Sequence, residues 1–157
     1  MTANSINAKD EFRLLKFKLS HTGKVVITVS GTSMLPVLCE GDKVGIVSSL
    51  EYDNGDILSF LYDENKVIVH RLLLHRKDRF FLKGDNSFRM EEVNYNNILG
   101  KVVEIERDGY VFKPTPIDLK FISDSLDVHS EFVKCGFDHK KVLQTSKYMD
   151  FEKNYIC

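Results

Sequence analysis

Short runs of β-branched and aromatic residues recur along the middle of the chain. The run K-V-V-I-T-V at residues 24–29 is the first, and six similar runs follow, at Lys43–Val47, Asp56–Tyr62, Val67–Leu74, Phe80–Leu82, Leu99–Ile105 and Tyr110–Phe112. Runs of this composition are typical of strands. Glycine-containing turns separate them and provide the positive φ angles that tight connections need. The pattern predicts a compact, mainly β domain with mostly antiparallel strands.

The N-terminal segment follows a different pattern. Phe12, Leu15 and Leu19 recur at helical spacing among basic residues, although Leu15, Phe17 and Leu19 also alternate as they would in a strand. We predict a helix between Lys9 and Leu19.

The C-terminal part also departs from the β pattern. Pro114-Thr115-Pro116 ends the strands, Thr115 to Asp118 has the composition of a helix start, and an apolar stripe then continues to Gly136. A second short helix is expected from Asp138. We therefore predict an N-terminal helical segment at 1–22, a catalytic β-domain at 23–113, and a C-terminal helical tail at 114–157, packed on or beside it.

Charge and cysteine content exclude several function classes. The 157-residue chain has 22 Lys and Arg against 23 Asp and Glu, without a block of like charges, so nucleic acid is not an expected partner. The three cysteines are widely spaced, which predicts neither a disulfide framework nor a metal site and indicates a reducing compartment. No apolar run is long enough to span a bilayer. We expect a cytoplasmic protein without a cofactor; contact of the N-terminal segment with a membrane surface and the oligomeric state stay open.

The first segment with candidate chemistry directly follows the first predicted strand. It reads Ser30-Gly31-Thr32-Ser33-Met34-Leu35-Pro36. A serine hydroxyl becomes a useful nucleophile when a turn exposes it and a nearby base takes its proton. Gly31 permits such a turn, which makes Ser33 the candidate nucleophile. The structural alternative is an ordinary polar turn.

A base and an acid are available further along the chain. In the run V-I-V-H-R-L, His70 shares the strand face of Ile68 and Leu72 and points opposite to Arg71. The turn K-G-D-N then presents Asp85, and Glu91 follows it; either carboxylate is able to orient a histidine. Taken singly, a core histidine and a hairpin turn explain these residues equally well.

Taken together, the segments resemble the signal peptidase I family. The ordered set is G-T-S-M-L-P, E-G-D-K-V, N-G-D-I-L-S-F, I-V-H-R, K-G-D-N and I-L-G-K-V, between residues 24 and 106. The position of His70 is lysine in typical bacterial members and histidine in the endoplasmic-reticulum and spore-former branches. The resemblance implies a β-domain of the LexA and signal peptidase type and a serine peptidase with Ser33 as nucleophile and His70 as general base. It also implies a leader or signal segment as substrate, bound as an extended strand.

The resemblance leaves the acid, the oxyanion donors and the substrate open. Alignment of K-G-D-N places Asp85 ahead, with Glu91 close behind. Gly31 stands where many bacterial members have a serine, which is closer to the LexA-type pattern and implies that the backbone N–H groups of Ser33 and Thr32 hold the oxyanion alone. The alternatives are a LexA-like self-processing regulator and a catalytically silent peptide-binding module.

Overall fold

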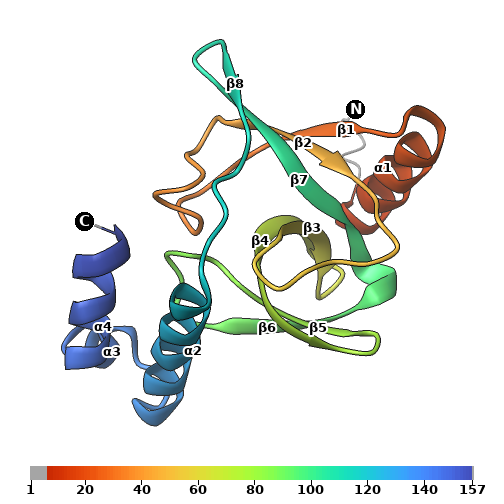
Figure 1. Cartoon of the computed structure of the whole chain (residues 1–157). Coiled ribbons are helices and arrows are strands. Elements are labelled where there is room, and N and C mark those ends of the chain that lie inside the picture. Colours follow the sequence, from red (N-terminus) through yellow and green to blue (C-terminus); the bar gives the residue numbers. More distant parts are fainter. Residues whose placement is uncertain (1–6, 157) are drawn as a thin grey trace, which may run out of the picture.

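The chain folds around one antiparallel sheet of eight strands. The computed structural model describes residues 7–156 (Figure 1). The strands are β1 (Val25–Thr28), β2 (Lys43–Val47), β3 (Ile57–Tyr62), β4 (Lys66–Arg76), β5 (Arg79–Lys83), β6 (Met90–Asn94), β7 (Ile98–Arg107) and β8 (Tyr110–Phe112). The prediction of a mainly antiparallel β fold is confirmed.

The order of the strands in the sheet is β1-β2-β7-β3-β4-β5-β6, with β8 paired to β7. The long strand β7 therefore joins two parts of the sheet that are separate in the sequence, since it pairs with β2 and with β3. Register shifts on both sides of β7 bend the sheet. The ribbon of the sheet is curled (Figure 1). Most of the buried apolar side chains of its strands belong to two clusters.

Strand β6 was not predicted. Its sequence, M-E-E-V-N, is acidic and contains a single β-branched residue. The two glutamates face opposite sides, and Glu91 is buried whereas Glu92 is exposed. Pairing with β5 thus overrides a composition that does not favour a strand.

The N-terminal segment is helical, as predicted. Helix α1 spans Ala8–Thr22; the side chain of Asn7 accepts a hydrogen bond from the N–H of Asp10, and Gly23 ends the helix at φ +78°. Phe12 and Leu19 are buried in the core where α1 packs against β1, β3 and β4, so the helical rather than the alternating pattern determines the local structure.

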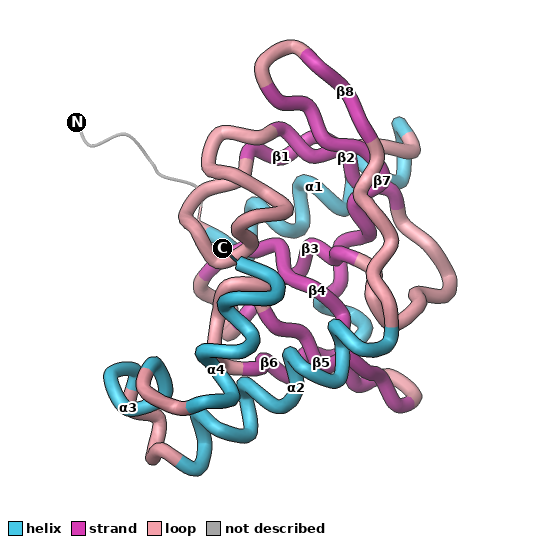
Figure 2. Tube along the Cα trace, turned by 60° about the vertical axis from the view of Figure 1, so that its left-hand side comes forward, coloured by secondary structure: helices cyan, strands magenta, loops and turns pink. Residues whose placement is uncertain are grey.

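The C-terminal helices are α2 (Leu119–Lys134), α3 (His139–Leu143), α4 (Ser146–Phe151) and a last turn, η2 (Glu152–Ile156); a short 3₁₀ turn, η1 (Tyr95–Asn97), precedes β7. Asp118 is the N-cap of α2, so this helix begins later than Thr115. Thr145 caps α4 and divides the expected second helix into two. Figure 2 shows α2 running across the sheet beside β5 and β6, with α4 against it. None of the helices within residues 7–156 has the length and apolarity that a membrane crossing requires.

Candidate active site

Ser33 lies in the loop between β1 and β2. Gly31 has φ +80° in this loop, and Met34 and Leu38 anchor it because both side chains are fully buried in the core. Ser33 itself is half-buried. The sequence thus places a partly exposed hydroxyl between a glycine turn and a firm apolar anchor.

His70 connects this hydroxyl to a carboxylate. Its Nε2 lies 3.0 Å from Ser33 Oγ, and its Nδ1 lies 3.0 Å from Glu91 Oε2. Glu91 accepts a hydrogen bond from Nδ1–H, which leaves Nε2 as the acceptor for the serine hydroxyl. Because His70 is only 6 % exposed and the ring of Phe60 packs against it edge-on at 6.0 Å, the imidazole is held in one orientation.

The carboxylate next to His70 is that of Glu91 and not that of Asp85, which sequence alignment placed ahead. Glu91 is the register partner of Leu82, which in turn pairs with Leu72. Glu91 therefore shares the inner face of the sheet with His70. Asp85 forms a buried ion pair with Arg71, at 3.0 Å from Nε and 2.6 Å from Nη2. Its negative charge is therefore already paired.

The turn Gly84–Asn86 packs directly against the nucleophile. The backbone N–H of Asn86 donates to the carbonyl oxygen of Ser33 at 2.8 Å, and the side-chain amide of Asn86 donates to the carbonyl of Thr32 at 3.2 Å. A Cβ on Gly84 would lie 2.5 Å from the Ser33 carbonyl oxygen and 3.1 Å from His70 Nε2, so only glycine fits there.

A groove of about 570 Å³ opens over these residues. Its lining includes Ser33, His70, Glu91 and, at positions that the sequence did not indicate, Phe88, Arg89 and His139. His139 begins α3, far in the chain from the segments of Ser33, His70 and Glu91, and no local pattern relates it to them. Lys66 also lines the groove, but the group within hydrogen-bond distance of Ser33 Oγ is the imidazole of His70.

Thr32 and Ser33 both line this groove. Among residues 7–156, neither of their backbone N–H groups donates a hydrogen bond to a protein acceptor. Both donors are thus available to a bound oxygen atom, as an oxyanion site requires.

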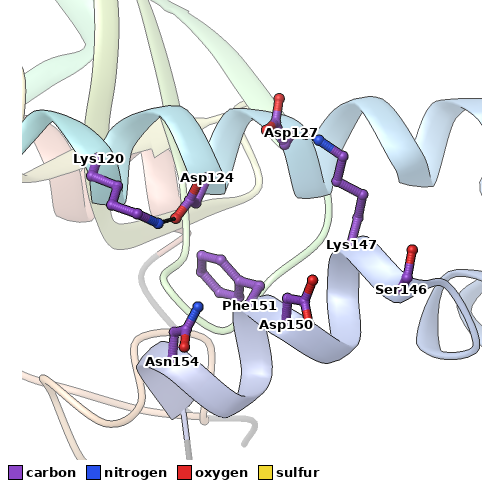
Figure 3. A pocket seen from close by; sticks show the side chains of 8 residues that line it. All are labelled: Lys120, Asp124, Asp127, Ser146, Lys147, Asp150, Phe151 and Asn154. Atoms are coloured by element: carbon purple, nitrogen blue, oxygen red, sulfur yellow. Dashed lines mark hydrogen bonds and ion pairs between the residues drawn. The ribbon is translucent and has the colours of Figure 1, made fainter.

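A second hollow, of about 310 Å³, lies between α2 and α4 (Figure 3). Four of its charged side chains form two pairs: Lys120 donates to Asp124 at 2.6 Å, and Lys147 donates to Asp127 at 3.2 Å. No cluster of three or more His, Cys, Asp or Glu that would hold a metal occurs in the described part of the chain. The candidate nucleophile, base and acid therefore lie in the groove at Ser33.

Comparison with known proteins identifies the family of the chain. Residues 2–103, which include Ser33, His70 and Glu91, match the Peptidase S24-like family. The chain belongs to the Peptidase S24-like family. The match supports the LexA-type β-domain that the resemblance implied, but it points to the S24-like family rather than to signal peptidase I.

Two relatives show how far the similarity of this S24-like chain extends. The LexA repressor of Lactiplantibacillus plantarum is 33 % identical over 105 residues, which cover 64 % of this chain and 49 % of the relative. The LexA repressor of Staphylococcus aureus (strain Newman) is 33 % identical over 86 residues, covering 53 % of this chain and 41 % of the relative. The chain thus spans about half the length of these relatives or less. Helices α2 to α4 lie beyond the S24-like match.

Proposed function

We propose that this S24-like protein is a serine peptidase in which Ser33, His70 and Glu91 act as a catalytic triad. The observation that carries the proposal is the continuous contact from Ser33 Oγ to His70 Nε2 and from His70 Nδ1 to Glu91, each at 3.0 Å. A nucleophile, a base and a group that orients the base are the parts that acyl transfer requires.

The proposed reaction has two stages. Neutral His70 takes the proton of Ser33 as Oγ attacks the peptide carbonyl, and the N–H groups of Thr32 and Ser33 bind the resulting oxyanion. The imidazolium, stabilised by the carboxylate of Glu91, then protonates the leaving amine. Water hydrolyses the acyl-serine with His70 again as base, and this regenerates the hydroxyl.

The free edge of β4 supports a substrate bound as an extended strand. Strand β3 pairs with β4 over Lys66–Arg71, whereas β5 pairs with β4 only from Arg71 onward. Within the described chain, residues 66–70 therefore have no strand on their second edge, and this is the side where Lys66, Ile68 and His70 line the groove. A polypeptide that adds a strand here passes its backbone across Ser33.

We further propose that the substrate is a segment of the same polypeptide. The sequence left a LexA-like self-processing regulator open as an alternative, and both relatives are named LexA repressors. Lys9 of α1 lies 3.5 Å from Glu64, in the turn just before Lys66. A segment that precedes α1 therefore joins the structure close to one end of the groove. Helix α1 itself is not the substrate, because Phe12 and Leu19 are buried in the core.

Cleavage of a leader segment in another polypeptide is the second candidate. The histidine at position 70 favours it, since the signal peptidase resemblance includes a branch with a histidine base. The order of the reaction separates the two candidates: self-processing within one molecule has a rate constant independent of protein concentration, whereas cleavage of a second chain accelerates with concentration.

Labelling with a fluorophosphonate tests the triad without knowledge of the substrate. The wild-type protein should be labelled, and peptide mapping should place the label on Ser33. Ser33→Ala and His70→Ala should lose labelling, because nucleophile and base act as a unit. Ser130→Ala, at an exposed position of α2, is the control and should be labelled as the wild type is. Labelling that persists in Ser33→Ala contradicts the proposal.

A further inference from the structure

Two buried basic side chains lie side by side behind the turn Gly84–Asn86, which we call the catalytic turn because it packs against Ser33. Arg71 on β4 and Lys83 on β5 are register partners and are 1 % and 0 % exposed, respectively. They are on the sheet face opposite to His70 and Glu91, and the C-terminal helices cover them. Neither side chain belongs to the proposed triad.

Each basic side chain joins the catalytic turn to these helices. Lys83 Nζ donates to the carbonyl oxygen of Gly84 at 3.2 Å and to Ser125 Oγ on α2 at 2.9 Å. It also lies 5.3 Å from the ring centre of Phe151 on α4. Figure 3 shows Phe151 between α4 and α2. Arg71 pairs with Asp85, and its guanidinium lies 5.6 Å from the ring centre of Phe121 on α2.

The turn held in this way contacts the backbone of the proposed nucleophile. Lys83 donates a hydrogen bond to Gly84, and Arg71 donates to Asp85. The next residue, Asn86, donates its N–H to the Ser33 carbonyl. The N–H of Asp85 also points to Met34 Sδ at 3.4 Å. A change in the orientation of the Gly84 peptide is thus passed directly to the backbone of Ser33.

We propose that Lys83 is a positioning residue for catalysis, and that α2 and α4 are required for full activity because they bury it against the turn that supports Ser33. This inference rests on the proposed peptidase function and assigns a role to helices beyond the S24-like match. Lys83 and Ser125 are not a second catalytic pair, since they are 0 % and 1 % exposed and no substrate reaches them.

The ammonium of Lys83 is unfavourable for stability at this position. Burial lowers the pKa of Lys83 to about 8, and the carboxylates of Asp85 and Glu91 oppose this lowering. The neighbouring charge on β4 is the guanidinium of Arg71. Helix α2 carries His129, which accepts a hydrogen bond from the N–H of Met90, the register partner of Lys83 on β6. The hollow beside Phe151 also holds charged groups of α2 and α4, namely Lys120, Asp124, Asp127, Lys147 and Asp150. A methionine fills similar space without a charge and therefore removes the free-energy cost of burying the ammonium.

The test compares Lys83→Met and Ser125→Ala with Lys147→Met, a control that removes an exposed ammonium from the same helical layer. The labelling rate of Ser33 is measured from pH 6 to 10, together with the melting temperature. Wild-type labelling should fall above about pH 8 as Lys83 loses its proton. Ser33 in Lys83→Met should be labelled about ten- to a hundredfold more slowly than in the wild type at pH 7, and its labelling rate should not decrease above pH 8. The melting temperature of this variant should be no lower than that of the wild type. Ser125→Ala should move the fall to lower pH, and Lys147→Met should change neither property.

Two outcomes overturn the inference while the peptidase function stands. In the first, Lys83→Met is labelled at the wild-type rate. In the second, Lys83→Met loses labelling rate and melting temperature in parallel, and its labelling rate still decreases above pH 8. If the wild type is not labelled, the peptidase function fails, and NMR decides on the positioning role alone. The amide signals of Ser33 and Asn86 should then titrate near pH 8 in the wild type but not in Lys83→Met. Signals that stay constant through this range in the wild type contradict the role.

Discussion

Replacement of Gly84 by alanine should displace the nucleophile without removing any reacting group. The added Cβ would stand 2.5 Å from the Ser33 carbonyl oxygen, whereas carbon–oxygen contacts of ordinary length are about 3.5 Å. The Ser33 backbone or the turn must therefore move by about 1 Å. The same Cβ would lie 2.5 Å from Ser87 Oγ, but that side chain is able to rotate away.

The size of the effect follows from this displacement. A shift of about 1 Å at a reacting group costs about a hundredfold in rate, and overpacking of a tight site costs about 1–3 kcal/mol of stability. We expect Gly84→Ala to be labelled about a hundredfold more slowly at pH 7 and to melt several degrees lower while remaining folded. The measurements are the pseudo-first-order labelling rate of Ser33 and the thermal unfolding curve.

Gly109→Ala provides the matched control. Gly109 has φ +81° in the turn between β7 and β8, and a methyl group added there would meet no atom of the described residues within 4 Å. Alanine at this position therefore adds backbone strain of about 1 kcal/mol but no contact with the site. It should lower the melting temperature and leave the labelling rate unchanged. If Gly84→Ala is labelled at the wild-type rate, the tight packing of the turn against Ser33 is not what positions the nucleophile.

Three further predictions concern the triad, the pH dependence of stability and the helical layer. Glu91→Gln should lower the labelling rate about a hundredfold or more because a neutral amide does not stabilise the imidazolium of His70; a loss below threefold would contradict the triad. A hydrogen bond from Arg107 holds the pKa of Asp42 below its usual range, so this pair stabilises the fold above about pH 4 and the contribution is lost as the pH falls further. The free energy of unfolding of Asp42→Asn should therefore lack this loss at low pH. If it falls with decreasing pH as much as that of the wild type, the prediction is refuted. Phe132 is fully buried among aromatic rings of the helical layer, so Phe132→Ala should cost about 3–5 kcal/mol in urea unfolding; a loss below 1 kcal/mol would show that the layer repacks.

The sequence predicts the part of the site that follows from strand periodicity. The alternation around His70 places its imidazole on the inner face, and the glycine turn after the first strand exposes Ser33. Their contact in the structure agrees with this expectation. Most strands also lie where β-branched residues are concentrated.

What the sequence does not reveal depends on pairing between distant segments. The choice between Asp85 and Glu91 follows from the register of β5 with β6 and from the capture of Asp85 by Arg71, and neither is visible in a motif. The acidic composition of β6 concealed both the strand and the buried glutamate on it. Nothing in the sequence indicates that Lys83 is buried, because a lysine at the end of a strand is ordinarily exposed.

The central position of β7 has a consequence for when the proposed site assembles during synthesis. Ser33, His70 and Glu91 all precede this strand in the chain, yet β2 and β3 are connected in the sheet only through it. A nascent chain that has emerged as far as Glu91 therefore contains every proposed reacting group but not the strand that brings the β1–β2 pair to the β3–β6 unit. Such late, long-range pairing delays assembly until Arg107 has left the ribosome. In the proposed triad, Ser33 is thus brought to His70 only after β7 has joined the two parts of the sheet.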